Sequence, residues 1–123
     1  MNGFYPEGWN EEKKKYSYSR SELLEAKLLE TVLESTVTMC DANHNLIVDL
    51  GSMKGLIPRN QGAIGIEDGT TRDIALISRV GKPVCFVVEN IETDNNGKPF
   101  SMLSRKRAQE LHLFPIFRRY GAI

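Results

Sequence analysis

A series of short strand-like segments, beginning near residue 35, constrains the fold more than any other feature of the chain. Residues 35–40 ("STVTMC") are rich in β-branched side chains, "DANHN" has turn chemistry, and residues 46–50 ("LIVDL") alternate, so the two segments predict a hairpin. Leu46, Val48 and Leu50 then share one face. Residues 51–54 turn the chain into a third strand, residues 55–58, and Pro58 marks an end or an edge because it lacks a backbone donor.

Two further strands follow a less regular region, residues 59–82. Within that region "IALI" fits a short helix or an inserted strand, and we predict the strand. Residues 83–91 ("PVCFVVENI") form the longest candidate strand, and because Cys85 and Val87 make its second face apolar, another element should cover it. "TDNNGK" predicts a hairpin loop, and residues 99–104 ("PFSMLS") the last strand.

Helices are expected on either side of the strands. Ser19 and Glu22 have the spacing of a capping box, and Leu24, Leu28 and Val32 recur at spacing four, widened by Leu23, Leu29 and Leu33. This stripe predicts a packed helix over residues 19–33. Residues 105–113 ("RKRAQELHL") predict a short helix that stops before Pro115. Residues 1–18 should be irregular, and the apolar end of the 109–123 extension suggests that the natural chain or a partner continues there.

The order of these elements predicts the fold class. A chain of 123 residues is sufficient for one core, and five strands between two helices favour an all-β core, a five-stranded antiparallel barrel of the OB-fold type, over residues 34–108. An open sandwich of the same strands is the competing architecture.

Charge is balanced overall but uneven along the chain. The formal net charge is zero, yet residues 98–123 contain six basic side chains and one acidic side chain, whereas residues 31–97 contain five and nine. A binding site responds to the local field, so the balance of the whole chain does not exclude a nucleic-acid partner. The sequence shows neither an apolar run of membrane-spanning length nor a signal peptide, so we expect a cytoplasmic protein that does not enter a membrane.

Catalytic and metal-binding patterns are weak. Cys40 and Cys85 lie singly in apolar segments without metal-ligand spacing, and burial there would raise the pKa of a thiol rather than activate it as a partner of His44. Acidic pairs lack metal-loop spacing, and no phosphate-binding glycine motif is present. We therefore expect neither an enzyme nor a cofactor. The enzyme alternative would require a cleft at Cys40 or His44.

Polar and basic residues gather where an OB-type barrel binds oligonucleotides, on the second and third strands and the two loops that flank them. The predicted nucleic-acid site consists of Asn43, His44, Asn45, Ile47, Lys54, Arg59, Lys98, Arg105, Lys106 and Arg107.

The segments "NLIVDLGSMKGLIP" and "VGKPVCFVVENIETDNNGKPFSMLSRKRA" resemble the S-one RNA-binding domain, the OB-fold repeat of the largest bacterial small-subunit ribosomal protein. The resemblance rests on Gly51, residues 55–57, residues 80–81 and residues 103–105. "GKPV" and "MNGFYPEGW" are similar to S-one-like proteins of Gram-positive bacteria. The resemblance to the S-one domain implies a translation-related bacterial protein that binds single-stranded RNA.

The chain departs from that family pattern where bases would stack. Ile47 replaces the aromatic residue of the second strand, His44 aligns with the aromatic residue just before it, and Pro58 replaces the histidine of the third strand. Ser35 replaces a glycine at the start of the first strand. Each lost stack is worth about 1–3 kcal/mol, so the resemblance implies weak RNA binding of low sequence specificity.

The missing aromatic residues leave a second function open. The barrel could be a protein-interaction or assembly module without direct RNA binding, which would associate through the apolar outer positions Cys85 and Val87 and through the chain termini.

Overall fold

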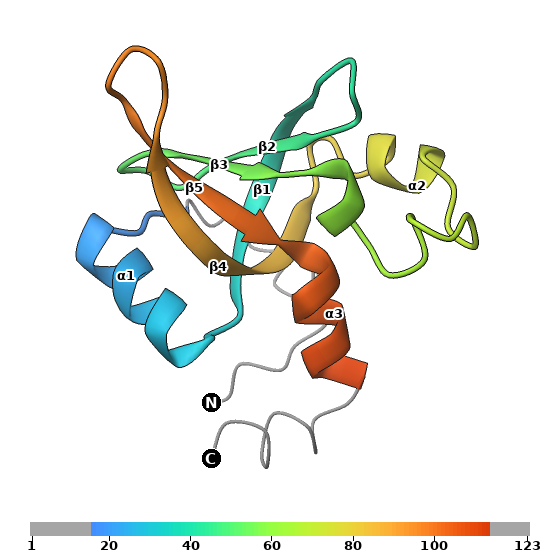
Figure 1. The fold of residues 1–123 in the computed structure, drawn as a ribbon, viewed down its shortest axis with the longest axis horizontal. Helices are drawn as coiled ribbons and strands as arrows, with labels where there is room; N and C mark the ends of the chain where they lie inside the picture. Colours follow the sequence, from blue (N-terminus) through green and yellow to red (C-terminus); the bar gives the residue numbers. More distant parts are fainter. Residues whose placement is uncertain (1–15, 114–123) are drawn as a thin grey trace.

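The structure is a computed structural model that describes residues 16–113. Five strands form a closed barrel in the order β1-β2-β3-β5-β4 (Figure 1), which is the strand order of an OB-fold. The strands are β1 (Leu33–Cys40), β2 (Leu46–Asp49), β3 (Lys54–Ile57), β4 (Pro83–Thr93) and β5 (Pro99–Ser104). The helices are α1 (Arg20–Leu29), α2 (Ile74–Ile77), α3 (Arg105–Leu113) and the 3₁₀ turn η1 (Arg59–Gln61). The predicted barrel is confirmed.

The strand pairing is mixed, so the prediction of a purely antiparallel barrel is wrong for one pair. β3 and β5 run parallel, with Lys54 opposite Phe100 and Leu56 opposite Met102, while the other four pairs are antiparallel. The reason is geometric, because a ring with an odd number of strands cannot alternate direction all the way round. At least one pair must be parallel, and here it is the pair of β3 and β5, between which β4 intervenes in the chain.

Alternation places the predicted residues in the core. Leu46, Val48 and Leu50 are fully buried, together with Phe86 and Leu103 from β4 and β5. Gly55 also faces inward, where an added Cβ would lie 2.4 Å from Leu103 Cδ1 and 2.7 Å from Val48 Cγ2. A side chain at this position would therefore displace the core.

α1 begins as predicted, but it buries only part of the predicted stripe. Ser19 Oγ accepts the Glu22 backbone N–H and the Glu22 carboxylate accepts the Ser19 N–H, which confirms the capping box. The helix ends at Leu29 and not at residue 33, because Glu30 adopts a left-handed conformation (φ 51°). It inserts Leu23 and the small Ala26 into the barrel core, whereas Leu28 is 83% exposed and Leu29 66%. Of the predicted leucine stripe, Leu23 is thus on the packed face, whereas Leu24, Leu28 and Leu29 are exposed.

α3 covers the outer side of β4. Val87 is fully buried in a second cluster with Ala108 and Leu111, against which Cys85 packs. The expectation that another element covers this face is therefore confirmed. The same contact removes Cys85 and Val87 as an exposed surface for self-association. α3 continues through residue 113, so the predicted boundary between barrel and extension at 108/109 falls inside this helix.

The "IALI" run is a helix, and the prediction of an inserted strand is wrong. The Ser78 N–H donates to Ile74 O at 3.0 Å, and Leu76 is the buried residue of this turn, while Ile74 and Ile77 are exposed. One buried residue in four fits a single helical turn, whereas a strand would bury alternate residues.

Most of the predicted irregular segment (1–18) and of the predicted extension (109–123) falls on residues 1–15 and 114–123, which lie outside the described residues. Among residues 16–113, no helix is long and apolar enough to cross a membrane. This same range contains no cluster of three or more metal-ligating side chains.

Candidate nucleic-acid interface

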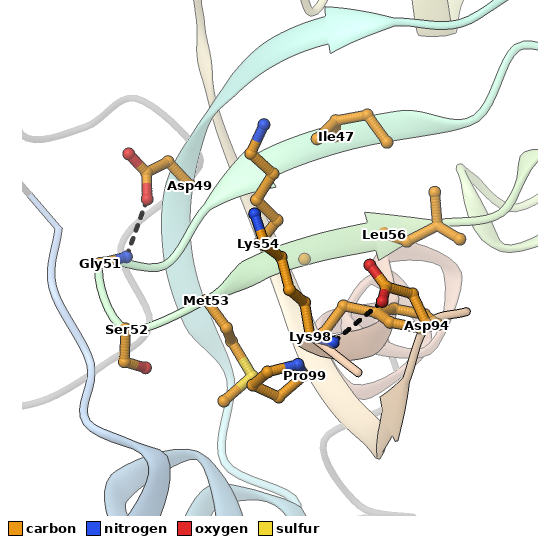
Figure 2. A pocket seen from close by; sticks show the side chains of 12 residues that line it. Ile47, Asp49, Gly51, Ser52, Met53, Lys54, Leu56, Asp94, Lys98 and Pro99 are labelled. Atoms are coloured by element: carbon orange, nitrogen blue, oxygen red, sulfur yellow. Dashed lines mark hydrogen bonds between the residues drawn. The ribbon is translucent and has the colours of Figure 1, made fainter. Parts of the chain in front are cut away.

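A groove of about 670 Å³ lies over the outer face of β2, β3 and β5 (Figure 2). The β2–β3 turn forms one edge with Gly51 and Ser52, and the β4–β5 loop contributes Asp94, Lys98 and Pro99. Gly51 adopts a φ of +88° in this turn, and a Cβ added there would lie 2.5 Å from Ser17 Oγ, because the segment before α1 packs against the turn. Barrel strands and two short turns therefore hold the whole groove.

Strand register arranges the outward side chains in and beside the groove in two rows. One row crosses the barrel as Asp49, Lys54 and Phe100, on β2, β3 and β5. The next row is apolar and runs from Met39 on β1 through Ile47, Leu56 and Met102. Ile47 and Leu56 line the groove with the first row. A charged row thus lies beside an apolar one.

Two lysines project into this groove from different elements. Lys54 comes from β3 and Lys98 from the β4–β5 loop, and Figure 2 shows the Lys98 side chain extending toward that of Lys54. Within the described part of the chain, neither lysine forms an ion pair. Two lysine side chains that enter one groove, and form no ion pair within the described residues, favour an anionic ligand.

Two carboxylates flank the lysines and are held by backbone hydrogen bonds. Asp49 Oδ1 accepts the Gly51 N–H at 2.9 Å. Asp94 Oδ1 accepts the backbone N–H groups of Asn96 at 2.8 Å and Lys98 at 2.9 Å, which closes the β4–β5 loop. The groove therefore contains two positive and two negative side chains, so its field is local and not strongly positive.

The β1–β2 turn lies outside this groove, and its residues form hydrogen bonds with other parts of the protein. Asp41 accepts the backbone N–H groups of Asn43 and Asn45, and the Asn45 N–H bond is the first cause of the lowered pKa of the Asp41 carboxyl. His44, at φ 64°, places Nδ1 2.6 Å from Asp73 Oδ2. Asn45 Oδ1 accepts the Arg59 N–H at 2.9 Å. His44 and Asn45 thus bond the turn to Asp73 and Arg59, whereas the Asn43 backbone bonds to Asp41 within the turn.

Arg59 shares the same acceptor, Asp73. Its Nη2 donates to Asp73 Oδ1 at 2.7 Å, and its Nε donates to both carboxylate oxygens. The Arg59 hydrogen bonds are the largest cause of the lowered pKa of the Asp73 carboxyl, and desolvation opposes them. Because the Asp73 carboxylate balances the charge of this guanidinium, Arg59 attracts a phosphate less strongly than an unpaired arginine would.

The side chains of the basic triplet 105–107, at the start of α3, form contacts within the protein. Arg105 is buried, 7% exposed, and its Nη1 donates to Gly62 O at 3.0 Å. Lys106 Nζ donates to Glu67, a hydrogen bond that raises the pKa of its ammonium group. Arg107 donates through two nitrogens to Glu30 and lies 3.7 Å from Glu110. The structure therefore brings together Ile47, Lys54 and Lys98 and leaves the other seven predicted residues outside the groove.

Phe100 is the groove residue that the sequence interpretation missed. It is half-buried and directly opposite Lys54 in the register. The alternation in "PFSMLS" contains the signal, because burial of Ser101 and Leu103 requires Phe100 and Met102 to face outward. At Cys40, desolvation raises the pKa of the thiol, whereas nucleophilic cysteines have a lowered pKa.

No family model and no curated protein matches this chain. Among solved structures, the chain is similar to GSP13 from Bacillus subtilis, whose structure was determined in solution. The two are 24% identical, the match covers 64% of this chain and 55% of GSP13, and the TM-score is 0.47. The match therefore spans little more than half the length of that protein.

Proposed function

We propose that the chain is a noncatalytic module that binds single-stranded RNA in the groove over β2, β3 and β5. One observation supports this above the others: Lys54, Lys98 and Phe100 lie in a single groove, and both lysines lack an internal partner among the described residues. Single-stranded nucleic acid requires cations along its backbone and a flat side chain on which a base can stack. The resemblance to the S-one domain supports RNA as the ligand and a translation-related, cytoplasmic setting.

The groove composition predicts weak binding. Phe100 is its one aromatic side chain, and Asp49 and Asp94 repel phosphates near the two lysines. With two phosphate contacts to single-stranded RNA, the logarithm of the binding constant should fall with the logarithm of salt concentration with a slope of about −1.4. A fourfold rise in salt would then weaken binding about sevenfold.

Fluorescence anisotropy of labelled single-stranded RNA of about 12 nucleotides tests the proposal, within the range that one OB-fold covers. Lys54→Glu/Lys98→Glu should weaken binding more than about tenfold, since both phosphate contacts are lost and repulsion is added. Lys106→Glu/Arg107→Glu is the matched control, with the same charge change at the other end of β5. It should change RNA affinity less than about twofold, because both residues already pair with acids.

Two results would contradict the proposal. One is the absence of binding to every single-stranded RNA at low salt, and the other is equal loss of affinity in the groove variant and in the α3 variant. Thermal unfolding of both variants would show whether a loss of binding reflects a loss of fold.

A protein-interaction module is the second candidate, and the exposed leucines of α1 favour it. Leu24, Leu28 and Leu29 project from a helix whose opposite face is buried in the barrel. Contiguous exposed apolar area marks contact sites. If the chain associates with itself through this face, light scattering should show a dimer that Leu28→Lys converts to monomer; a monomer for the unmodified chain would reject this version.

A further inference from the structure

Asp49 occupies a position in the groove that general RNA binding does not require. A carboxylate repels phosphates, yet this one lies on the same outward row as Lys54 and Phe100. Neighbouring strands are about 4.8 Å apart, so the backbones at Asp49 and Phe100, two strands apart, are separated by about 10 Å. A base stacked on Phe100 and lying above the Lys54 stem would present its edge to Asp49.

The Asp49 carboxylate is also fixed in place, and one of its oxygens can still accept a hydrogen bond from a ligand. Oδ1 receives the Gly51 N–H at 2.9 Å, which anchors the side chain to the β2–β3 turn. No hydrogen bond to Oδ2 exists within the described residues, and Asp49 forms no ion pair there, although Lys54 is its cross-strand partner. Figure 2 shows the carboxylate at the edge of the groove beside that turn.

This inference rests on the proposed function. We infer that Asp49 discriminates between bases, accepting a hydrogen bond from the amino group of a base stacked on Phe100. An ionised carboxylate accepts hydrogen bonds and cannot donate them. Cytosine offers the N4 amino group, whereas uracil has a carbonyl oxygen at the same position that would face the carboxylate. The groove therefore prefers amino-bearing bases to uracil.

Cytosine and uracil give the sharpest comparison, because their rings have the same size and differ at the group that would face Asp49. Labelled oligocytidine and oligouridine of about 12 nucleotides would be titrated with the full chain at one low salt concentration and neutral pH. Oligocytidine should bind about tenfold tighter, the ratio that a single well-formed base contact can provide.

Asp49→Asn and Asp94→Asn separate base recognition from charge. Asparagine at either position retains an oxygen that can accept the backbone N–H groups of its turn. Because an amide both donates and accepts, Asp49→Asn should bring the cytidine-to-uridine ratio close to one. Asp94→Asn removes the same charge from the other side of the groove, so it should strengthen binding to both oligonucleotides and leave their ratio unchanged.

Equal affinity of the unmodified chain for the two oligonucleotides would overturn the inference while leaving the proposed function in place. A ratio that persists in Asp49→Asn, or one that disappears in Asp94→Asn instead, would also overturn it. Failure of the unmodified chain to bind either oligonucleotide would overturn the proposed function, and the inference with it.

Discussion

Basic residues lie at both ends of β5, but those at one end line the groove and those at the other end bond to oxygens of the protein. Lys98 precedes the strand and joins Lys54 in the groove, where neither forms an ion pair within the described chain. Arg105, Lys106 and Arg107 follow the strand, about 20 Å away along its six residues, and each donates to an oxygen of the protein. Figure 1 shows the β4–β5 loop and α3 at opposite ends of the barrel.

The comparison shows that charge density along a sequence is a poor guide to a binding surface. The triplet 105–107 is the densest basic run of the last two elements, yet its side chains donate hydrogen bonds to the Gly62 carbonyl and to the carboxylates of Glu67 and Glu30. The two lysines are isolated in the sequence and converge through the parallel β3–β5 pairing and the β4–β5 loop. The unpaired cations, although fewer, are the ones available to a ligand.

The largest effect that would test this contrast is on stability. Arg105→Met should lower the free energy of unfolding by about 2 kcal/mol, because it removes a charged hydrogen bond to the buried Gly62 carbonyl. RNA affinity, measured where the variant is folded, should stay within about twofold. Urea denaturation and RNA anisotropy together provide the measurement. Lys106→Ala, which loses a surface ion pair, is the control and should cost much less.

The opposite pattern would contradict the contrast. If Arg105→Met retained full stability and lost RNA affinity, Arg105 would belong to the binding surface and the groove assignment would be wrong.

The sequence was sufficient to predict features that depend on neighbouring residues. The capping box at Ser19, the alternation of β2 and the Asn- and Gly-rich β4–β5 loop each follow from contacts within a few residues. The direction of the β3–β5 pair was not predictable in this way, because closing the ring involves every strand. The pairing of Arg107 was not predictable either, because its partner Glu30 is 77 positions away in the sequence.

The predicted leucine stripe of α1 was only partly right, for a related reason. Periodicity showed that the helix is amphipathic, but both Leu23 with Ala26 and Leu24 with Leu28 are compatible with helical spacing. The barrel selects the pair containing the small alanine, a choice of packing that the helix sequence does not contain. Phe100 could have been found, because the alternation of β5 is a local signal.

The next largest effect concerns the aromatic platform of the groove. Phe100→Leu should weaken binding to single-stranded RNA about tenfold, since one base stack is worth about 1–3 kcal/mol. Met102→Leu is the matched control, because Met102 faces outward from the same strand and does not line the groove. Anisotropy titrations of both variants should separate them; similar losses would indicate that general apolar area, rather than stacking, holds the RNA.

The smallest effect tests the cluster that fastens the β1–β2 turn. Arg59 and then His44 keep the pKa of Asp73 below its usual range, so this carboxylate adds stability that is present above the unfolded pKa of about 3.9 and is lost as pH falls through the lower folded pKa. Asp73→Asn should therefore be less stable than the unmodified chain at pH 7, and denaturant titrations should show the difference shrinking toward pH 3.

The same variant tests where RNA lies. Asp73→Asn releases the charge of Arg59 and removes the carboxylate beside His44. If RNA occupies the groove alone, its affinity at pH 7 should change less than about twofold, because the cluster is outside the groove lining. A clear rise in affinity would mean that the β1–β2 turn also contacts RNA, as the sequence predicted for His44 and Arg59. The interface would then extend from the groove across the barrel to α2.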